Sequence, residues 1–322
     1  MIEVRGLTKR FGETLAVDQL SFQVQPGIVT GFLGPNGSGK STTMRMIMGL
    51  DNPTAGAATV NGKDYRELSA PMHEVGALLD AKAVHGGMTA EQHLRWVARA
   101  GKVSPGRVPA VLELVGLEKV ADRRTGGFSL GMMQRLGIAT ALLGDPKVLM
   151  FDEPVNGLDP EGIRWVRNLL KQLASEGRTV FVSSHLMSEM EATAEHVIVI
   201  GRGRLIADGS IEALTQGSTD SYVRVVTPKA NEFAGVLEEE GGRIRREDGA
   251  LLVRDLGAPA IGELAAARGI ALHELSPHRA RLEAAFFELT RDSVEYQSRE
   301  DGASPDDVAV TAAALAQEEE TR

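Results

Sequence analysis

Short apolar runs alternate with longer helical patterns from residue 2 to about residue 215. Runs rich in Val and Ile that end at polar or turn-forming residues predict strands, and apolar residues spaced by three and four predict helices. The alternation predicts an α/β fold in which helices cover a largely parallel sheet. The runs that are almost wholly apolar, as strands buried on both faces are, lie at 29–33, 148–151 and 179–183.

Helical spacing at 89–100 and 107–115 predicts a helical insert over about residues 85–145, between the first two of these strands. A second pattern begins beyond residue 217 and predicts a small α+β domain. Its elements are expected in the order strand, helix, hairpin, helix, strand and closing helix, at 222–226, 231–240, 243–254, 258–268, 272–275 and 282–290.

From residue 291 onward apolar residues become sparse, and Asp, Glu, Ser and Ala dominate. The sequence therefore predicts three parts. They are a main domain over 1–216, a C-terminal α+β accessory domain over 217–290 and an acidic disordered tail over 291–322.

Charge is uneven along the chain of 322 residues. There are 35 Lys and Arg against 44 Asp and Glu, a net charge of −9. The predicted tail holds nine of the acids and three of the bases, so it contributes −6 and leaves −3 for residues 1–290. Nucleic-acid binding draws on clustered Lys and Arg, so no nucleic-acid partner is expected, whereas docking at an anionic membrane surface is not disfavoured.

The chain has no Cys, which excludes disulfides and thiolate metal sites. No run approaches the roughly 18 consecutive apolar residues of a membrane-spanning helix. The first five residues include an acid where a signal peptide needs a basic and then an apolar run. Neither a membrane span nor secretion is expected.

A phosphate-binding loop is predicted between the strand at 29–33 and a helix at 41–50, where GPNGSGKST satisfies the pattern G-x-x-x-x-G-K-[ST]. Glycines let successive backbone N–H groups curl around a polyphosphate, and the helix N-terminus adds its positive dipole end. Lys40 is expected to reach the outer phosphates, and the Ser41 hydroxyl is expected to bind Mg²⁺. The predicted ATP-binding residues of this loop are Gly34, Pro35, Asn36, Gly37, Ser38, Gly39, Lys40, Ser41 and Thr42.

Two carboxylates follow the apolar strand at 148–151, at the strand end where open α/β sheets bind ligands. Asp152 is expected to hold Mg²⁺, and Glu153 is placed to polarise a water in line with the γ-phosphate. The alternative is a strand that simply ends in solvated acids. The phosphate loop earlier in the chain favours the functional reading.

Three further motifs and one aromatic residue, Phe11, give this P-loop NTPase sequence a resemblance to the ATP-binding subunits of ABC transporters over about residues 1–215. FSLGM at 128–132 resembles the signature motif, GLD at 157–159 the D-loop, and SSH at 183–185 the switch histidine. The resemblance implies that Ser129 and Gly131 bind ATP, that Asp159 and His185 complete the catalytic site, and that Phe11 stacks on adenine. Structural roles for His185 and Phe11 remain the alternatives.

Two positions depart from the pattern of the family. The signature has Met132 where the family usually has Gln, although the hydroxyl and backbone donors of Ser129 and Gly131 are kept. Asp80 stands where the family has the Gln of its Q-loop. Its carboxylate could strengthen a Mg²⁺ contact or repel the γ-phosphate, so Asp80 is a candidate ATP and metal ligand, with a solvated loop residue as the alternative.

A narrower resemblance links QRLGIA at 134–139 and NGLDPEGI at 156–163 to ATPases of bacitracin-resistance and multidrug exporters, and 282–290 matches more weakly. It implies an ATP-hydrolysing subunit that powers a separate ABC-2-type permease for export of a drug, antibiotic or lipid. The permease would dock between Asp80 and Arg99, placing the chain at the cytoplasmic face of a bacterial membrane.

The resemblance also implies a homodimer or a pair with a related ATPase subunit, because in this family each nucleotide is bound between the phosphate loop of one subunit and the signature of the other. Two other classes stay open. One is a soluble ABC-type ATPase that regulates a nucleic-acid or ribosome process, and the other is a P-loop small-molecule kinase. The kinase would leave the signature and D-loop matches unexplained.

Overall fold

A six-stranded sheet forms the centre of the computed structural model, which describes residues 1–216 and 221–290. Its strand order is β5-β6-β7-β3-β8-β9, and all neighbours are parallel except β8 and β9. The three strands predicted to be buried on both faces lie in its middle, which confirms the α/β prediction. The strands are β3 (Val29–Leu33), β5 (Val75–Leu78), β6 (Val148–Asp152), β7 (Thr179–Ser184), β8 (His196–Gly201) and β9 (Arg204–Ser210).

One face of the central sheet packs against a second, antiparallel sheet and helix α1. The rings of Phe22, Phe32 and Phe181 meet there with centroids 5.0 to 5.7 Å apart. Helix α1 ends at Ile47, earlier than predicted, because the backbone leaves the helical conformation at Met48. The elements on this face are β1 (Ile2–Phe11), β2 (Thr14–Val24), β4 (Ala55–Val60) and α1 (Lys40–Ile47).

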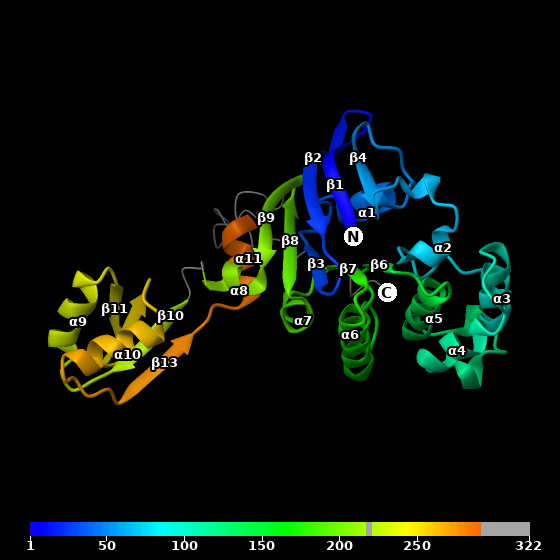
Figure 1. Cartoon of the computed structure of the whole chain (residues 1–322). Coiled ribbons are helices and arrows are strands. Elements are labelled where there is room, and N and C mark those ends of the chain that lie inside the picture. Colours follow the sequence, from blue (N-terminus) through cyan, green and yellow to red (C-terminus); the bar gives the residue numbers. More distant parts are fainter. Residues whose placement is uncertain (217–220, 291–322) are drawn as a thin grey trace, which may run out of the picture.

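Helices cover the other face of the sheet and extend beyond its β5 edge as the predicted helical insert (Figure 1). Thr89 begins α3 with a capping box, in which its hydroxyl accepts from Gln92 N and the Gln92 side chain accepts from Thr89 N. The helices are α2 (Pro71–Glu74), α3 (Ala90–Ala100), α4 (Arg107–Leu114), α5 (Leu130–Leu142), α6 (Pro160–Ser175) and α7 (Met187–Thr193), with 3-10 turns at Tyr65–Glu67, Glu118–Val120 and Thr125–Gly127.

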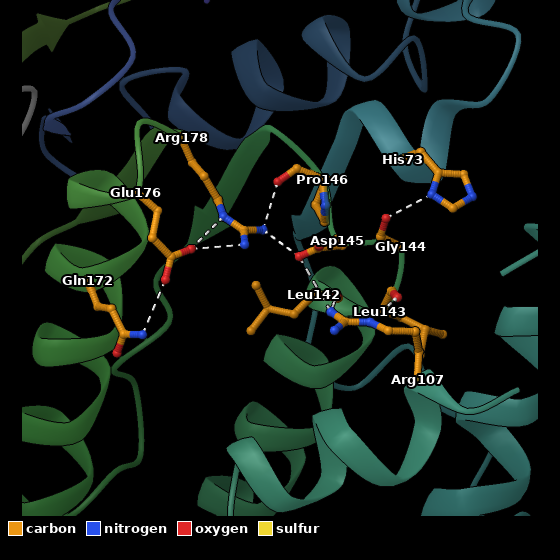
Figure 2. A network of polar contacts seen from close by, with 10 residues as sticks. All are labelled: His73, Arg107, Leu142, Leu143, Gly144, Asp145, Pro146, Gln172, Glu176 and Arg178. Carbon is orange, nitrogen blue, oxygen red and sulfur yellow. Dashed lines mark hydrogen bonds and ion pairs between the residues drawn. The ribbon is translucent and has the colours of Figure 1, made fainter. Parts of the chain in front are cut away.

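Polar contacts tie the insert to the amino-terminal edge of the sheet, as Figure 2 shows. Arg178 contacts Asp145 at 3.0 Å and Glu176 at 2.9 Å, and it donates to the carbonyl of Pro146. Arg107 of α4 donates to the carbonyl of Leu142 at 3.1 Å. These contacts anchor the loop before β6. They therefore fix the position of the strand that carries the acidic pair at its carboxyl end.

The accessory region has its own four-stranded antiparallel sheet, in the order β11-β12-β10-β13, and its own apolar core. The chain order is βαββαβ, as predicted, but β13 lies later than predicted because it pairs with β10 along Tyr222–Val226. The elements are β10 (Tyr222–Val226), α9 (Ala230–Glu239), β11 (Arg243–Glu247), β12 (Ala250–Arg254), α10 (Ala258–Ala267) and β13 (Glu274–His278). Helix α8 (Ile211–Gln216), which precedes them, packs on the main domain.

The final helix, α11 (Leu282–Thr290), does not close the accessory sheet, which corrects that prediction. Leu282 and Phe286 belong instead to the apolar core of the main domain, where α11 packs beside α7 and α8. Residues 217–220 and the predicted acidic tail at 291–322 lie outside the described residues. Within the described part of the chain, no helix has both the length and the apolar character needed to cross a membrane.

Candidate active site

The phosphate loop joins β3 to α1 at the carboxyl edge of the central sheet. Gly39 caps α1 with φ +103°, and a Cβ at this position would lie 2.6 Å from the carbonyl oxygen of Ala16. Only glycine fits both the backbone angle and the close approach. Gly39 therefore sets the turn from the loop into α1, and the N-terminus of such a helix favours a phosphate.

Lys40 is buried, with 7% of its surface exposed. Its Nζ donates to the carbonyl of Gly34 at 2.6 Å and contacts that of Pro35 at 3.3 Å. Burial lowers the pKa of Lys40, while the negative charges of Glu153 and Asp152 oppose this shift. An ammonium held among carbonyl oxygens and facing two carboxylates is suited to outer phosphate oxygens.

The acidic pair lines the same pocket as the phosphate loop, in a volume of about 220 Å³. Asp152 ends β6, and its Oδ1 accepts a short hydrogen bond from the hydroxyl of Ser183 on β7. Nδ1 of His185 lies 2.8 Å from Oε2 of Glu153. The pocket is lined by Ala16, Asn36, Gly37, Ser38, Gly39, Lys40, Ser41, Thr42, Asp152 and Glu153.

Glu153 adopts a left-handed backbone conformation with φ +50°. Its N–H donates to the Ser183 hydroxyl at 3.0 Å, and its carbonyl accepts from the buried side chain of Gln134 at 3.4 Å. These contacts hold a backbone conformation that non-glycine residues seldom adopt. They aim the carboxylate at the pocket and at His185.

The donor set fits a magnesium nucleotide. The hydroxyl of Ser38 is buried without a hydrogen-bond partner in the described structure, beside the loop backbone. Ser41 and Asp152 line one pocket and supply the oxygen ligands that Mg²⁺ prefers, and Lys40 supplies the cation for the phosphates. The residues present therefore match both ATP and Mg²⁺.

The signature and D-loop meet each other rather than the phosphate loop. Ser129 caps α5, where its Oγ accepts from the N–H of Met132 at 3.2 Å. Asp159 caps α6, where its Oδ1 accepts from Gly162 N at 2.8 Å. Between them, Gly157 has φ +75°, and a Cβ there would lie 2.1 Å from Leu130 Cδ2.

Ser129, Gly131 and Asp159 lie outside the described residues that line the phosphate-loop pocket. So do Phe11 and Asp80. The Phe11 ring is half exposed and lies 4.8 Å from Nζ of Lys9. Asp80 follows β5, where its Oδ1 accepts from Lys82 N at 2.8 Å and so forms a local turn.

Sequence reasoning missed Ser183 as a site residue and used it only as part of a motif. In the parallel pairing of β6 and β7, Ser183 is the partner of Asp152. A hydroxyl at the end of an apolar strand is a local signal, but the strand order that brings it to Asp152 is a tertiary property. Ala16 and Gln134 were missed too, because each reaches the site through tertiary packing.

A phosphate loop, an acidic strand end and a switch histidine on this sheet define an ABC-type ATPase. Residues 17–156 match the family described as ABC transporter, and residues 221–283 match a domain of unknown function. The chain belongs to the ABC transporter family as an ATP-binding subunit, and its classification as an ATPase is confirmed.

Relatives cover most of the chain. It is 35% identical to the uncharacterized ABC transporter ATP-binding protein YhcH of Bacillus subtilis, over 92% of this chain and 97% of that protein. It is 40% identical to the bacitracin transport ATP-binding protein BcrA of Bacillus licheniformis, over 74% of this chain and 79% of that protein. A dimeric structure of MJ0796, a bacterial ABC transporter cassette, matches with a TM-score of 0.60 and 25% identity, over 65% of this chain and 98% of that one.

Proposed function

We propose that the chain powers a separate ABC-2-type membrane permease that exports a drug, antibiotic or lipid. Relatives named for bacitracin transport and lantibiotic transport support export of an antibiotic-like compound. We propose that the transport path belongs to another chain, since these relatives are named as the ATP-binding proteins of transport systems. The protein would act at the cytoplasmic face of a bacterial membrane, held there by its permease.

The contact between Glu153 and His185 is the observation that supports ATP hydrolysis, which supplies the energy for export in this proposal. In the proposed reaction, Glu153 polarises a water in line with the γ-phosphate, and His185 orients that carboxylate through their 2.8 Å contact. Lys40 and the phosphate loop bind the polyphosphate. Ser41 and Asp152 would hold Mg²⁺, which neutralises charge that develops on the phosphates when it is bound.

Two ATPase subunits are needed for a complete site. Ser129 and Gly131 lie at a surface outside their own chain's pocket, so they are available to a nucleotide held by a homodimeric or related partner. The dimeric cassette structure supports this arrangement. Asp159 would enter the same interface, because its loop packs on the signature through Leu130 and Gly157.

The permease would dock on the helical insert between Asp80 and Arg99. Trp96 supports this placement, since its side chain is 63% exposed. It lines a groove of about 770 Å³ together with Arg99 and Lys102. An exposed Trp beside an Arg is typical of interaction surfaces, where aromatic residues and Arg are enriched. The domain limits that we propose are 1–216 together with α11 (Leu282–Thr290) for the cassette, and 217–281 for the accessory part, because α11 packs in the core of the main domain.

A Glu153→Gln variant tests the proposal. It keeps the shape of the side chain but cannot polarise water, so it should accumulate an ATP-bound dimer and hydrolyse ATP at least about 100-fold more slowly. Glu113→Gln, at an exposed position of α4, is the matched control. Turnover like that of the unmodified chain would overturn the role of Glu153.

Membrane co-purification tests the partner. A captured protein with several apolar spans of about 20 residues would support a permease. Capture of ribosomes or nucleic acid, or transfer of phosphate to a metabolite in a product assay, would contradict the proposal of an exporter.

A further inference from the structure

Helix α11 contacts α7, although the two lie far apart in the sequence. Figure 1 shows α11 beside α8, which it also contacts. Ala285 and Phe286 are buried, and Phe286 shares an apolar core with Met190 of α7. The chain thus leaves the main domain after α8, forms the accessory sheet and returns to pack on α7.

The carboxylate of Glu191 holds the start of α11 against α7. Oε2 of Glu191, an exposed residue of α7, accepts a hydrogen bond from the backbone N–H of Leu282 at 3.1 Å. Leu282 is the first residue of α11 and is buried. A carboxylate is favoured there, because the first N–H groups of a helix have no partner within it and carry the positive end of the dipole.

Helix α7 is held on its other sides as well. Arg167 of α6 contacts Glu189 at 3.0 Å. Met190 packs on β3, since a Cβ at Gly31 would lie 2.6 Å from its sulfur. Helix α7 begins at Met187, two residues after His185. The position of the histidine therefore follows from how α7 is seated.

We infer that Glu191 and α11 are positioning elements of the ATPase site, which seat α7 and so hold His185 against Glu153. The inference rests on the proposed role of His185. Because β13 leads into α11 within four residues, the accessory sheet is joined to the switch histidine through this contact. A segment that does not line the phosphate-loop pocket thus helps to set the rate of hydrolysis.

Glu191→Ala in the full chain is the first test. Without the capping carboxylate, α7 should loosen and kcat for ATP hydrolysis should fall about five- to tenfold, since small displacements of catalytic groups cost large factors in rate. KM for ATP should change less than about twofold, because the phosphate loop is untouched. Hydrogen exchange should rise across residues 187–193.

Three variants make the test specific. Glu191→Gln keeps an oxygen acceptor for Leu282 N and should restore most of the rate. Glu238→Ala, at an exposed position of α9, should leave the rate of ATP hydrolysis unchanged. Phe286→Ala removes the apolar part of the same contact and should reproduce the loss in kcat.

Single-turnover rates in a His185→Ala background separate this inference from the proposed function. There, Glu191→Ala should cause no further loss, because the residue acts through the histidine. An unchanged kcat in Glu191→Ala, or a full additional loss in the His185→Ala background, would overturn the inference. If His185→Ala alone hydrolyses ATP normally, the proposed role of His185 fails, and the inference fails with it.

Discussion

The hydroxyl of Ser183 donates a hydrogen bond to Oδ1 of Asp152 across neighbouring strands β7 and β6. The Ser183 hydroxyl oxygen in turn accepts a hydrogen bond from the backbone N–H of Glu153 at 3.0 Å. One buried side chain thus orients the proposed metal ligand and the backbone of the proposed catalytic carboxylate. A buried hydroxyl with both donor and acceptor in use has little freedom to rotate.

Ser183→Ala should lower kcat for ATP hydrolysis about tenfold, or ~1.4 kcal/mol in the barrier, because the hydrogen bonds that orient ligands tune their metal. It should also raise the Mg²⁺ concentration needed for half-maximal rate. A magnesium titration of the ATPase checks both. Ser184→Ala is the control, since that hydroxyl is buried as well but accepts from Leu186 N. Equal magnesium dependence in the two variants would contradict the role given to Ser183.

Gly157→Ala should impair the interface between ATPase subunits. The added Cβ would lie 2.1 Å from the Leu130 side chain, at φ +75°, so either that side chain or the signature helix must shift. We expect ATP-dependent dimerisation of a Glu153→Gln chain to weaken at least about tenfold, measured by sedimentation. Gly127 also lies near the signature, and a Cβ added there would have nothing within 4 Å. Gly127→Ala should therefore have little effect. Equal dimerisation of both variants would count against this view.

Asp80→Gln should leave ATP affinity within about twofold and change turnover at least about threefold. A loss of turnover would indicate that the carboxylate aids the metal, and a gain would indicate repulsion of the γ-phosphate. Asp80→Asn keeps an acceptor for Lys82 N and so separates charge from turn geometry. Unchanged basal and permease-coupled ATPase rates in both variants would exclude a role for Asp80.

His93 should make the helical insert sensitive to acid. Its Nε2 lies 3.2 Å from the Thr140 hydroxyl, and burial lowers its pKa below the usual 6.5. Because the unfolded chain then binds a proton more readily, the contribution to stability is complete above pH 6.5 and is lost as pH falls toward the folded pKa. Between pH 7.5 and 5.5, Tm should fall about 2 °C more in the unmodified chain than in His93→Gln. Parallel melting curves would contradict this.

The strands that carry the site could be predicted because their apolar runs are local signals. Lys40 and Glu153 were also predicted from local signals. Lys40 is part of the phosphate-loop pattern, and Glu153 directly follows an apolar strand. The partnership of Ser183 with Asp152 could not be found, because the strand order β5-β6-β7-β3 is a tertiary property. The packing of α11 on the main domain was missed for a related reason. The apolar stripe of this helix indicates burial but does not identify the surface that covers it.

Phe11 and Asp80 show that a resemblance to a family identifies the position of a candidate site residue but not its contacts. Each occupies the expected place in the sequence, yet each has a local contact, with Lys9 and with Lys82 N, in this conformation. Motif position predicts which strand end a residue follows. It does not determine whether the side chain turns toward the pocket before a nucleotide or a second subunit is present.

The backbone angle of Glu153, φ +50°, has a consequence for how this protein can change. A left-handed conformation costs a glutamate about 1 kcal/mol that a glycine would not incur. Glu153→Gly, which removes the carboxylate and so abolishes hydrolysis, should therefore yield a more stable chain than the active one. Selection for stability alone would drive this position away from catalysis, and only continued demand for ATP turnover opposes that drift.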